Sequence, residues 1–249
     1  ELREKLDPQS FGATFGATCT GFGAQYLQSL ADTPARVDLV YHGLDLTRFP
    51  EPPARRPRAP GDPLAPMSVG RMVEKKGFDR LIEAFALLPA TLDWHWTHIG
   101  GGALKNELQA LATARGVASR ITWRGPCDQP EVIETMRASD LFVLPSRVAA
   151  DGDRDGLPNI LMEAASQRLA ILSTPVSAIP EFIENGTHGV LSDDAPASLA
   201  REIEALAADP QHAARMAEAA HARLTAEFQM APGIAHLARR LRGMVRQAA

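Results

Sequence analysis

Short apolar segments typical of β-strands alternate with segments of helical periodicity between residues 67 and 191 of this chain. The strand-like segments are 67–69, 94–99, 121–123, 141–144, 170–172 and 189–191, and the helix-like segments are 78–88, 103–115, 131–138, 158–167 and 180–184. This alternation predicts an α/β fold with a doubly wound parallel sheet. Ligands of such sheets lie beyond the carboxyl ends of the strands, so the loops that follow strands are expected to hold the chemistry.

The residues before this region have a different character. Residues 50–66 hold seven prolines, which excludes a helix or a central strand and predicts a semi-rigid linker. Residues 1–49 offer only a weak strand at 37–41 and a helix near 25–30. Such a segment is too small to form an independent core.

The residues from Ala197 onward are predicted to be helical, with natural breaks at Pro210 and Pro232. Their last helix carries an apolar stripe beside several arginines, a pattern that a helix at a membrane surface also shows. The predicted organisation is therefore a leading segment (1–49), a linker (50–66), an α/β domain (67–208) and C-terminal helices (209–249).

Composition narrows the class of protein. The 249 residues include 26 basic and 30 acidic side chains, and the net charge of -4 argues against a dedicated nucleic-acid binder. Two cysteines cannot build a disulfide framework or a cysteine-rich metal site, which favours a reducing compartment. The first residues, Glu1–Leu6, do not resemble a signal peptide, and no apolar run is long enough to span a bilayer.

The loop from Gly70 to Gly77 follows the first predicted strand and opens a helix. Gly70 allows close approach of the backbone, and a helix N-terminus favours an anion. Arg71 and Lys76 add two cations, of which the arginine fork suits a phosphate group. A solvated basic turn explains the same residues equally well, because neither a Walker P-loop nor a Gly-x-Gly-x-x-Gly spacing is present.

A second loop follows the apolar strand 141–144. Asp155 precedes the next helix and Glu163 lies eight residues later, a distance of roughly 12 Å if both were helical. That separation excludes a close catalytic pair but suits two contacts with one extended ligand. Apolar neighbours of Glu163 predict that it is partly buried and needs a partner. The run Asp151–Gly156 imitates a calcium loop, but Met162 occupies the twelfth position, so we prefer a flexible, solvated acidic loop to a metal site.

The remaining signals are weaker. Gly100–Gly102 and residues 174–181 also follow strands. The seven histidines show no metal spacing, and we expect His98, like His95, to be structural. His42 follows a strand before the linker and could face a cleft between domains. Cys127 has no base or orienting group assigned to it, so a nucleophilic role is not expected.

Taken in order, these loops resemble the donor-nucleotide domain of retaining glycosyltransferases of family 4, the "group 1" enzymes of the GT-B fold. The resemblance covers about Val37 to the C-terminus. The motifs that carry it are 41–49, Val69–Gly77, Ile99–Gly102, Trp123–Gly125, Ser139–Ser146, Asp155–Asn159 with Glu163–Ala164, Ile179–Glu181 and Asn185–Gly189. Each motif is weak alone, and their order makes the set specific.

The resemblance implies a role for each loop. Arg71 and Lys76 would bind the diphosphate of a UDP- or GDP-sugar, beside Gly70, and Glu163 would hold the ribose hydroxyls. Asp155 would contact the donor sugar, although much of the family has glutamate there, one methylene longer. The backbone of Gly156, Leu157 and Pro158 would line the sugar and phosphate, and Gly125–Asp128 would lie near the base. Arg71, Lys76 and Asp155 are thus the expected catalytic residues.

The resemblance also implies transfer with retention of anomeric configuration, by same-face attack through an oxocarbenium-like state. No protein nucleophile, metal or other cofactor is expected, because preorganised cations stabilise the leaving diphosphate. The expected setting is polysaccharide or glycoconjugate synthesis, in the cytoplasm or at the inner face of the membrane. The resemblance implies that the last helix packs on the protein rather than on that membrane.

Only the donor half of such an enzyme is matched. Residues 1–49 would be the remnant of an N-terminal acceptor domain, which would be the chain's missing partner. The chain is therefore predicted to be a truncated half-enzyme that binds the donor and transfers nothing alone. Two alternatives stay open: a GT-B-fold nucleotide-sugar 2-epimerase, and a nucleotide-sugar-binding module without activity.

Overall fold

The computed structural model describes residues 16–30, 37–52, 54–55, 57–59 and 61–247. The segment Glu1–Leu6 and the linker positions Pro53, Arg56 and Pro60 lie outside the described residues. The chain divides into two compact units, one formed by residues 1–46 with 228–249 and one by residues 47–227. We call them unit 1 and unit 2 and describe each by itself. The predicted domain boundaries stay a prediction.

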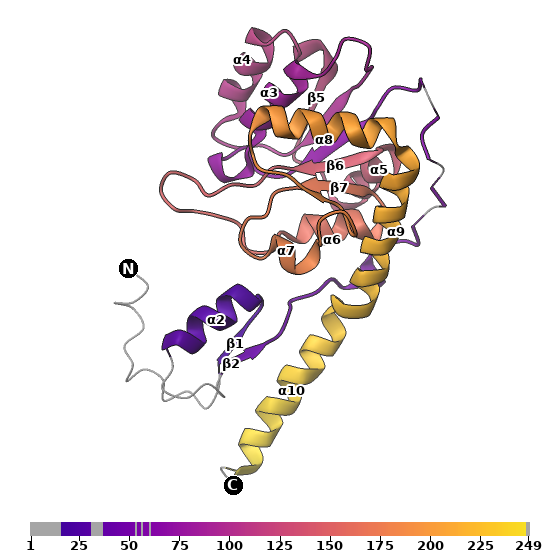
Figure 1. Cartoon of the computed structure of the whole chain (residues 1–249). Helices are drawn as coiled ribbons and strands as arrows, with labels where there is room; N and C mark the ends of the chain where they lie inside the picture. Colours follow the sequence, from indigo (N-terminus) through magenta and orange to yellow (C-terminus); the bar gives the residue numbers. More distant parts are fainter. Residues whose placement is uncertain (1–15, 31–36, 53, 56, 60, 248–249) are drawn as a thin grey trace. The chain divides into compact units, whose positions relative to one another are not determined.

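Unit 2 is an α/β fold around six parallel strands (Figure 1). The strands are β3 (Pro66–Val69), β4 (Trp96–Ile99), β5 (Ile121–Gly125), β6 (Leu141–Leu144), β7 (Ala170–Ser173) and β8 (Val190–Leu191). Their order in the sheet is β5-β4-β3-β6-β7-β8. The order reverses between β3 and β6, which confirms the predicted doubly wound sheet and marks where a ligand is expected.

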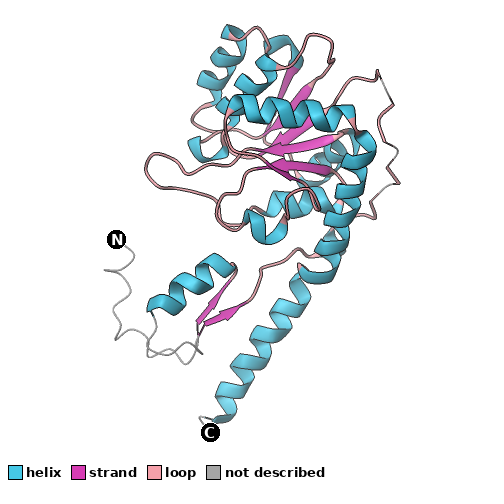
Figure 2. Ribbon diagram, in the orientation of Figure 1, coloured by secondary structure: helices cyan, strands magenta, loops and turns pink. Residues whose placement is uncertain are grey.

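Helices enclose these strands (Figure 2). They are α3 (Phe78–Leu87), α4 (Lys105–Ala114), α5 (Gln129–Ala138), α6 (Asn159–Ser166), α7 (Ile179–Phe182), α8 (Pro196–Ala208) and α9 (Pro210–Glu227), with 3-10 turns η3 (Leu46–Arg48), η4 (Glu74–Lys76) and η5 (Ala118–Arg120). Every residue of β6 and β7 is buried, as the continuous apolar runs predict. Helix α3 buries Phe78, Leu81, Ile82, Ala84 and Phe85 on its apolar stripe.

Unit 1 joins residues that are far apart in the sequence. Strand β1 (Gly16–Thr18) pairs in parallel with β2 (Val37–Leu39), and α2 (Gly21–Leu30) lies between them in the chain. Helix α10 (Met230–Gln247) adds His236 and Arg240, which both contact the Asp38 carboxylate, at 3.0 and 2.7 Å. The described residues of the leading segment up to Leu46 therefore form one compact unit together with the C-terminal helix.

Two proline predictions need correction. The break between the last helices lies at residues 228–229, and Pro232 sits inside the first turn of α10. Proline is tolerated there because the first backbone donors of a helix have no intrahelical partner. Pro66 was excluded from a central strand, yet it begins β3, which lies between β4 and β6. A strand accepts proline at its first residue.

The proline-rich segment is fastened to unit 2 by Arg55. Its guanidinium donates to the carbonyls of Gln167 at 2.9 Å, Ser139 at 2.6 Å and Met136. These carbonyls belong to the C-terminal ends of α5 and α6, where helices leave carbonyls without an intrahelical partner. The Met136 carbonyl also accepts from the Ser139 amide at 3.3 Å. Arg58 likewise donates to the carbonyl of Ala207 in the last turn of α8. Through these two arginines the proline-rich segment is bound to the C-terminal ends of α5, α6 and α8.

We predict that Arg55→Ala destabilises unit 2. Met136, Ser139 and Gln167 are all buried, so water cannot replace the lost donors. We expect a loss of about 2–3 kcal/mol in the free energy of unfolding, the usual cost of removing a charged donor from buried acceptors. Urea unfolding of the variant and the parent chain measures it.

Arg201→Ala is the matched control for this experiment. Arg201 is exposed on α8 and pairs only with its neighbour Glu202 among the contacts described. An equal effect of both substitutions on the urea midpoint would contradict the role assigned to Arg55.

Candidate active site at the carboxyl ends of the strands

Three glycine-containing loops meet at the carboxyl ends of β3, β4 and β5. The Gly70 amide donates to the Ile99 carbonyl at 3.0 Å, and the Gly100 amide donates to the Gly125 carbonyl at 2.8 Å. Beyond the ends of the strands, the Met72 amide donates to the Gly101 carbonyl at 2.7 Å. The structure thus brings together loops that are weak signals when read separately.

Gly100 shows why one of these positions is glycine. Its φ is +139°, and a Cβ atom there would lie 2.0 Å from the Gly70 carbonyl oxygen. Any other residue would push the Gly70 loop away from the end of β4. The close approach of the two backbones fixes the shape of this edge of the sheet.

The loop after β3 also packs against the loop after β6, at the reversal of strand order. Gly77 has a φ of +66° and precedes α3, and a Cβ atom there would lie 2.0 Å from the Pro145 carbonyl oxygen. The amide of Arg147 donates to the Lys75 carbonyl at 2.8 Å. These contacts hold the two loops side by side.

Asp155 lies at the centre of a charged cluster between these loops. Lys76 Nζ is 2.7 Å from Asp155 Oδ2, and Lys75 Nζ is 3.6 Å from Asp155 Oδ1. Ser146 Oγ donates to Oδ2 at 3.2 Å. The side chains of Asp155, Lys76 and Lys75 are only 12%, 13% and 14% exposed, so the attraction is weakly screened by water. The structure brings together two residues that the sequence analysis placed in one site.

Arg71 differs from the lysines. Its side chain is exposed, and within the described part of the chain it forms no ion pair. It is therefore a cation beside Gly70 that is available to an incoming anion.

Lys75 and Ser146 are members of this cluster that the sequence analysis missed. Lys75 is next to Lys76 in the sequence, and neighbouring residues of a helix normally point in different directions. The 3-10 turn η4 lets both ammonium groups reach the same carboxylate. Only the long-range contact with residue 155 identifies Lys75, and a sequence pattern carries no signal of it.

The acidic loop is tied to the loop after β3 by several contacts. Lys75 Nζ pairs with Asp153 at 3.0 Å, and the Ala150 amide donates to Glu74 Oε1 at 3.1 Å. Arg147 pairs with Asp79 at 2.9 Å. The loop is solvated as expected, since Asp153 is 57% exposed. It is not a free loop, because the Asp153 carboxylate pairs with the mostly buried Lys75 ammonium.

Glu163 is half-buried on α6, as the apolar neighbours predict. Burial raises the pKa of its carboxyl, and the positive charge of Arg48 offsets part of that rise. Among the described residues, none donates a hydrogen bond to this carboxylate. Since α6 begins at Asn159, Asp155 lies in the loop before the helix, and the helical spacing of the two carboxylates does not apply.

The turn between Asp155 and α6 holds the other residues of this loop that are expected to contact the donor. Gly156 is exposed, Leu157 is buried and Pro158 is half-buried. Pro158 occupies the N-cap position of α6 with an extended conformation. The free amides of the first turn of α6 therefore lie just after Asp155 in the chain.

His98 is buried beneath the Gly70 loop. Trp96 Nε1 donates to Ser68 Oγ at 2.9 Å, and the same oxygen is hydrogen-bonded to His98 Nδ1, also at 2.9 Å. Burial lowers the pKa of His98 to about 4, so the imidazole is neutral at pH 7. This is the structural role expected from the sequence.

The described residues contain no group of three His, Cys, Asp or Glu side chains that could hold a metal ion. The acids of the loop after β6 contact Lys75 and Lys76 instead. Within the same residues, no helix is long and apolar enough to cross a membrane.

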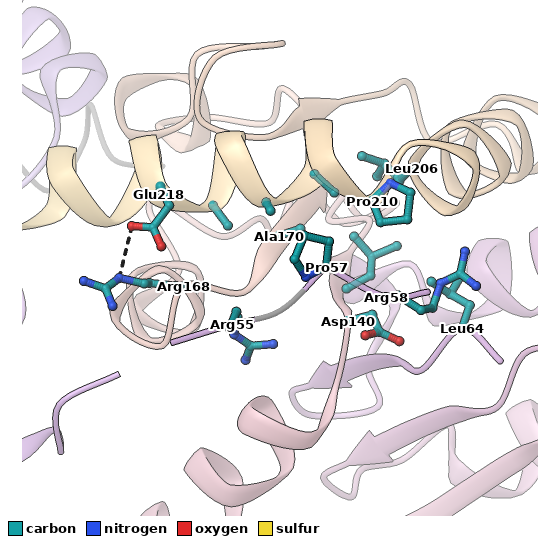
Figure 3. Close-up of a pocket in the computed structure, with 14 residues that line it drawn as sticks. Arg55, Pro57, Arg58, Leu64, Asp140, Arg168, Ala170, Leu206, Pro210 and Glu218 are labelled. Atoms are coloured by element: carbon teal, nitrogen blue, oxygen red, sulfur yellow. Dashed lines mark ion pairs between the residues drawn. The ribbon is translucent and has the colours of Figure 1, made fainter. Parts of the chain in front are cut away.

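Figure 3 shows a pocket at the amino ends of the strands, opposite the candidate site. Leu64, Leu141 and Ala170 place it at the amino ends of β3, β6 and β7. Its arginines are already paired: Arg55 and Arg58 with helix carbonyls, and Arg168 with Glu218 at 3.1 Å. This pocket therefore offers no free cation among these three side chains, and the candidate site is the cluster at the carboxyl edge.

Comparison with known proteins identifies the fold and the family. Residues 54–223 match the family described as glycosyl transferases group 1. The chain is 35% identical over 181 residues to the Salmonella typhimurium glycosyltransferase WcaL, whose name assigns it to colanic acid biosynthesis, covering 72% of this chain and 44% of the relative. It is 34% identical over 170 residues to LpsE of Rhizobium meliloti, a lipopolysaccharide core biosynthesis glycosyltransferase, covering 68% of this chain and 47% of the relative.

The chain thus spans less than half the length of these two curated relatives. Among solved structures, HepE from Anabaena in complex with UDP and glucose superimposes with a TM-score of 0.75, over 97% of this chain and 69% of HepE. The two sequences are 17% identical, so this likeness concerns the fold alone. It confirms the predicted GT-B-type α/β architecture.

We predict that Glu163→Gln stabilises the protein at neutral pH. The carboxyl has a higher pKa in the folded chain than in the unfolded chain, so the unfolded chain loses its proton first as pH rises. Stability therefore falls through that window and stays lower above the folded pKa. We expect a higher melting temperature for the variant at about pH 7, and no difference below about pH 3, where both states of the parent are protonated.

Glu204→Gln is the control, because Glu204 is exposed on α8. A Glu163→Gln variant that melts like the Glu204→Gln variant at both pH values would contradict a raised pKa at Glu163.

Proposed function

Since the chain belongs to the group 1 glycosyl transferases, we propose that unit 2 binds the diphosphate of a nucleotide-sugar donor at the carboxyl ends of β3 and β6. The observation that carries the proposal is the position of the loop after β3, which holds Arg71 and Lys76: it lies where the order of strands reverses, and Lys76 pairs there with Asp155 from the loop after β6. Ligands of doubly wound sheets bind at this point, and a diphosphate is the anion that such a set of cations suits.

The residues of the site then take the following roles. Arg71 and Lys76 hold the diphosphate beside the backbone of Gly70, and the amides that follow Gly156, Leu157 and Pro158 assist at the start of α6. Asp155 contacts the donor sugar, Glu163 accepts from the ribose hydroxyls, and the loop at Gly125 lies near the base. The half-buried Glu163 carboxylate, which has no described donor, supports its part, because a buried carboxylate gains from hydroxyl donors.

We propose that the intact protein transfers a hexosyl group to an acceptor with retention of configuration, by same-face attack. The chain's own contribution is charge: Arg71 and Lys76 stabilise the diphosphate as the glycosidic bond breaks and negative charge grows on it. This charge makes a metal unnecessary in the proposal.

The choice of donor and pathway rests on the relatives. HepE was solved with UDP, which supports a UDP-sugar, and a GDP-sugar fits the same diphosphate contacts. The names of WcaL and LpsE assign them to colanic acid and lipopolysaccharide core biosynthesis, which supports a role in polysaccharide or glycoconjugate synthesis. We propose that this synthesis takes place in the cytoplasm or at the inner face of the membrane. The chain spans less than half the length of those relatives, and we propose that the acceptor is bound by the part it does not match, so that these 249 residues bind the donor without transferring it.

We predict that UDP or GDP raises the melting temperature of the chain, because a ligand that binds only the folded state stabilises it. Arg71→Ala and Lys76→Ala should each weaken nucleotide binding about tenfold to a hundredfold, the cost of losing a charged hydrogen bond. Calorimetric titration measures the affinities.

Arg201→Ala serves as the matched control and is expected to bind like the parent chain. Unchanged affinity in both the Arg71 and the Lys76 variants would sink the assignment of the diphosphate site. A parent chain that binds neither UDP nor GDP would sink the proposed function itself.

A further inference from the structure

The Asp155 carboxylate cannot depend on Lys76 alone if Lys76 also binds a diphosphate. Asp155 is only 12% exposed, so water does not replace a cation that leaves it. Removing the partner of a nearly buried charge is strongly unfavourable. Donor binding therefore requires that another group neutralise Asp155 when Lys76 turns to the phosphates.

Lys75 has the position for this task. Its ammonium is 3.6 Å from Asp155 Oδ1, the oxygen that Lys76 does not occupy, and it is 14% exposed. Ser146, which is fully buried, keeps a hydrogen bond to the other oxygen at 3.2 Å. Lys75 and Ser146 together leave Asp155 with a cation and a donor after Lys76 has moved.

The surrounding contacts hold Lys75 in place. Its ammonium pairs with Asp153 at 3.0 Å, and its carbonyl accepts from the Arg147 amide at 2.8 Å. Glu74 accepts from the Ala150 amide on the same loop. Lys75 is thus anchored to the acidic loop by side chain and backbone, which makes it a fixed charge beside Asp155 rather than a mobile one.

We propose that Lys75 is a positioning residue of the donor site, which neutralises and orients Asp155 so that Lys76 is released to the diphosphate. This inference rests on the proposed function. In this arrangement Lys75 acts on the ligand through Asp155 and does not itself touch the phosphates.

A double-mutant cycle with Asp155 tests the inference. The affinity for UDP is measured by calorimetry for the parent chain, Lys75→Met, Asp155→Asn and the double variant. We expect Lys75→Met alone to weaken UDP binding about tenfold, because Lys76 must then stay with Asp155. In the Asp155→Asn background the same substitution should change the affinity less than about twofold, because an amide needs no cation.

Three further variants control for total charge, for local charge and for folding. Lys105→Met removes the same charge from the other lysine among the described residues, which is exposed and forms no described ion pair, and it should bind UDP like the parent. Lys75→Arg keeps the charge beside Asp155 and should restore most of the affinity. Lys75→Gln replaces Lys75→Met if the latter lowers the melting temperature without ligand.

The outcomes that overturn the inference are distinct. Equal losses from Lys75→Met in both backgrounds would make Lys75 a direct phosphate ligand. An affinity equal to that of Lys105→Met would remove Lys75 from the site. If the parent chain binds neither UDP nor GDP, the proposed function fails and this inference falls with it, whereas parent binding with no coupling refutes the inference alone.

Discussion

A parallel sheet whose strand order reverses in the middle sends its connections to both of its faces, and the arrangement of unit 2 depends on that reversal. The connection from β3 through α3 leads to one side, and the connection from β6 through α6 leads to the other. Since such crossovers are right-handed as a rule, these connections are expected to lie on opposite faces of the sheet. The loops that leave β3 and β6 nevertheless start side by side, which brings their polar side chains together.

Ion pairs connect the loop after β3 to the loop after β6. The loop after β3 brings basic side chains and the loop after β6 brings acidic ones, so each loop supplies the counterions of the other. Gly77 lets the two backbones approach at Pro145, which places those charges within ion-pair distance. These contacts hold Lys75 and Asp155 in place within the chain itself, so in the proposed arrangement Lys76 is the charged group of the cluster that has to move, which lowers the cost of ordering the site on binding.

Local patterns predicted the sheet and its helices, because a buried strand and an amphipathic helix each show their burial in a short window of sequence. Leu141–Leu144 and the stripe on α3 are examples. The contacts that a window cannot show were missed: Arg55 reaches carbonyls more than 80 residues away, and Lys75 reaches Asp155 across 80 residues. Predicting Arg71 and Lys76 together with Asp155 depended on their order along the chain, whereas the role of Ser146 depends on a side-chain direction that no pattern encodes.

Unit 1 is built from two segments that are far apart in the sequence, and this affects the order in which the protein folds. Unit 2 is one continuous stretch, so it can fold as soon as its last helix has been synthesised. Unit 1 must wait for α10, since Asp38 finds His236 and Arg240 only after some 200 further residues have been made. Contacts of such separation close slowly. Strands β1 and β2 are thus secured only once α10 has been made, and shortening α10 before His236 would remove both of these partners of Asp38.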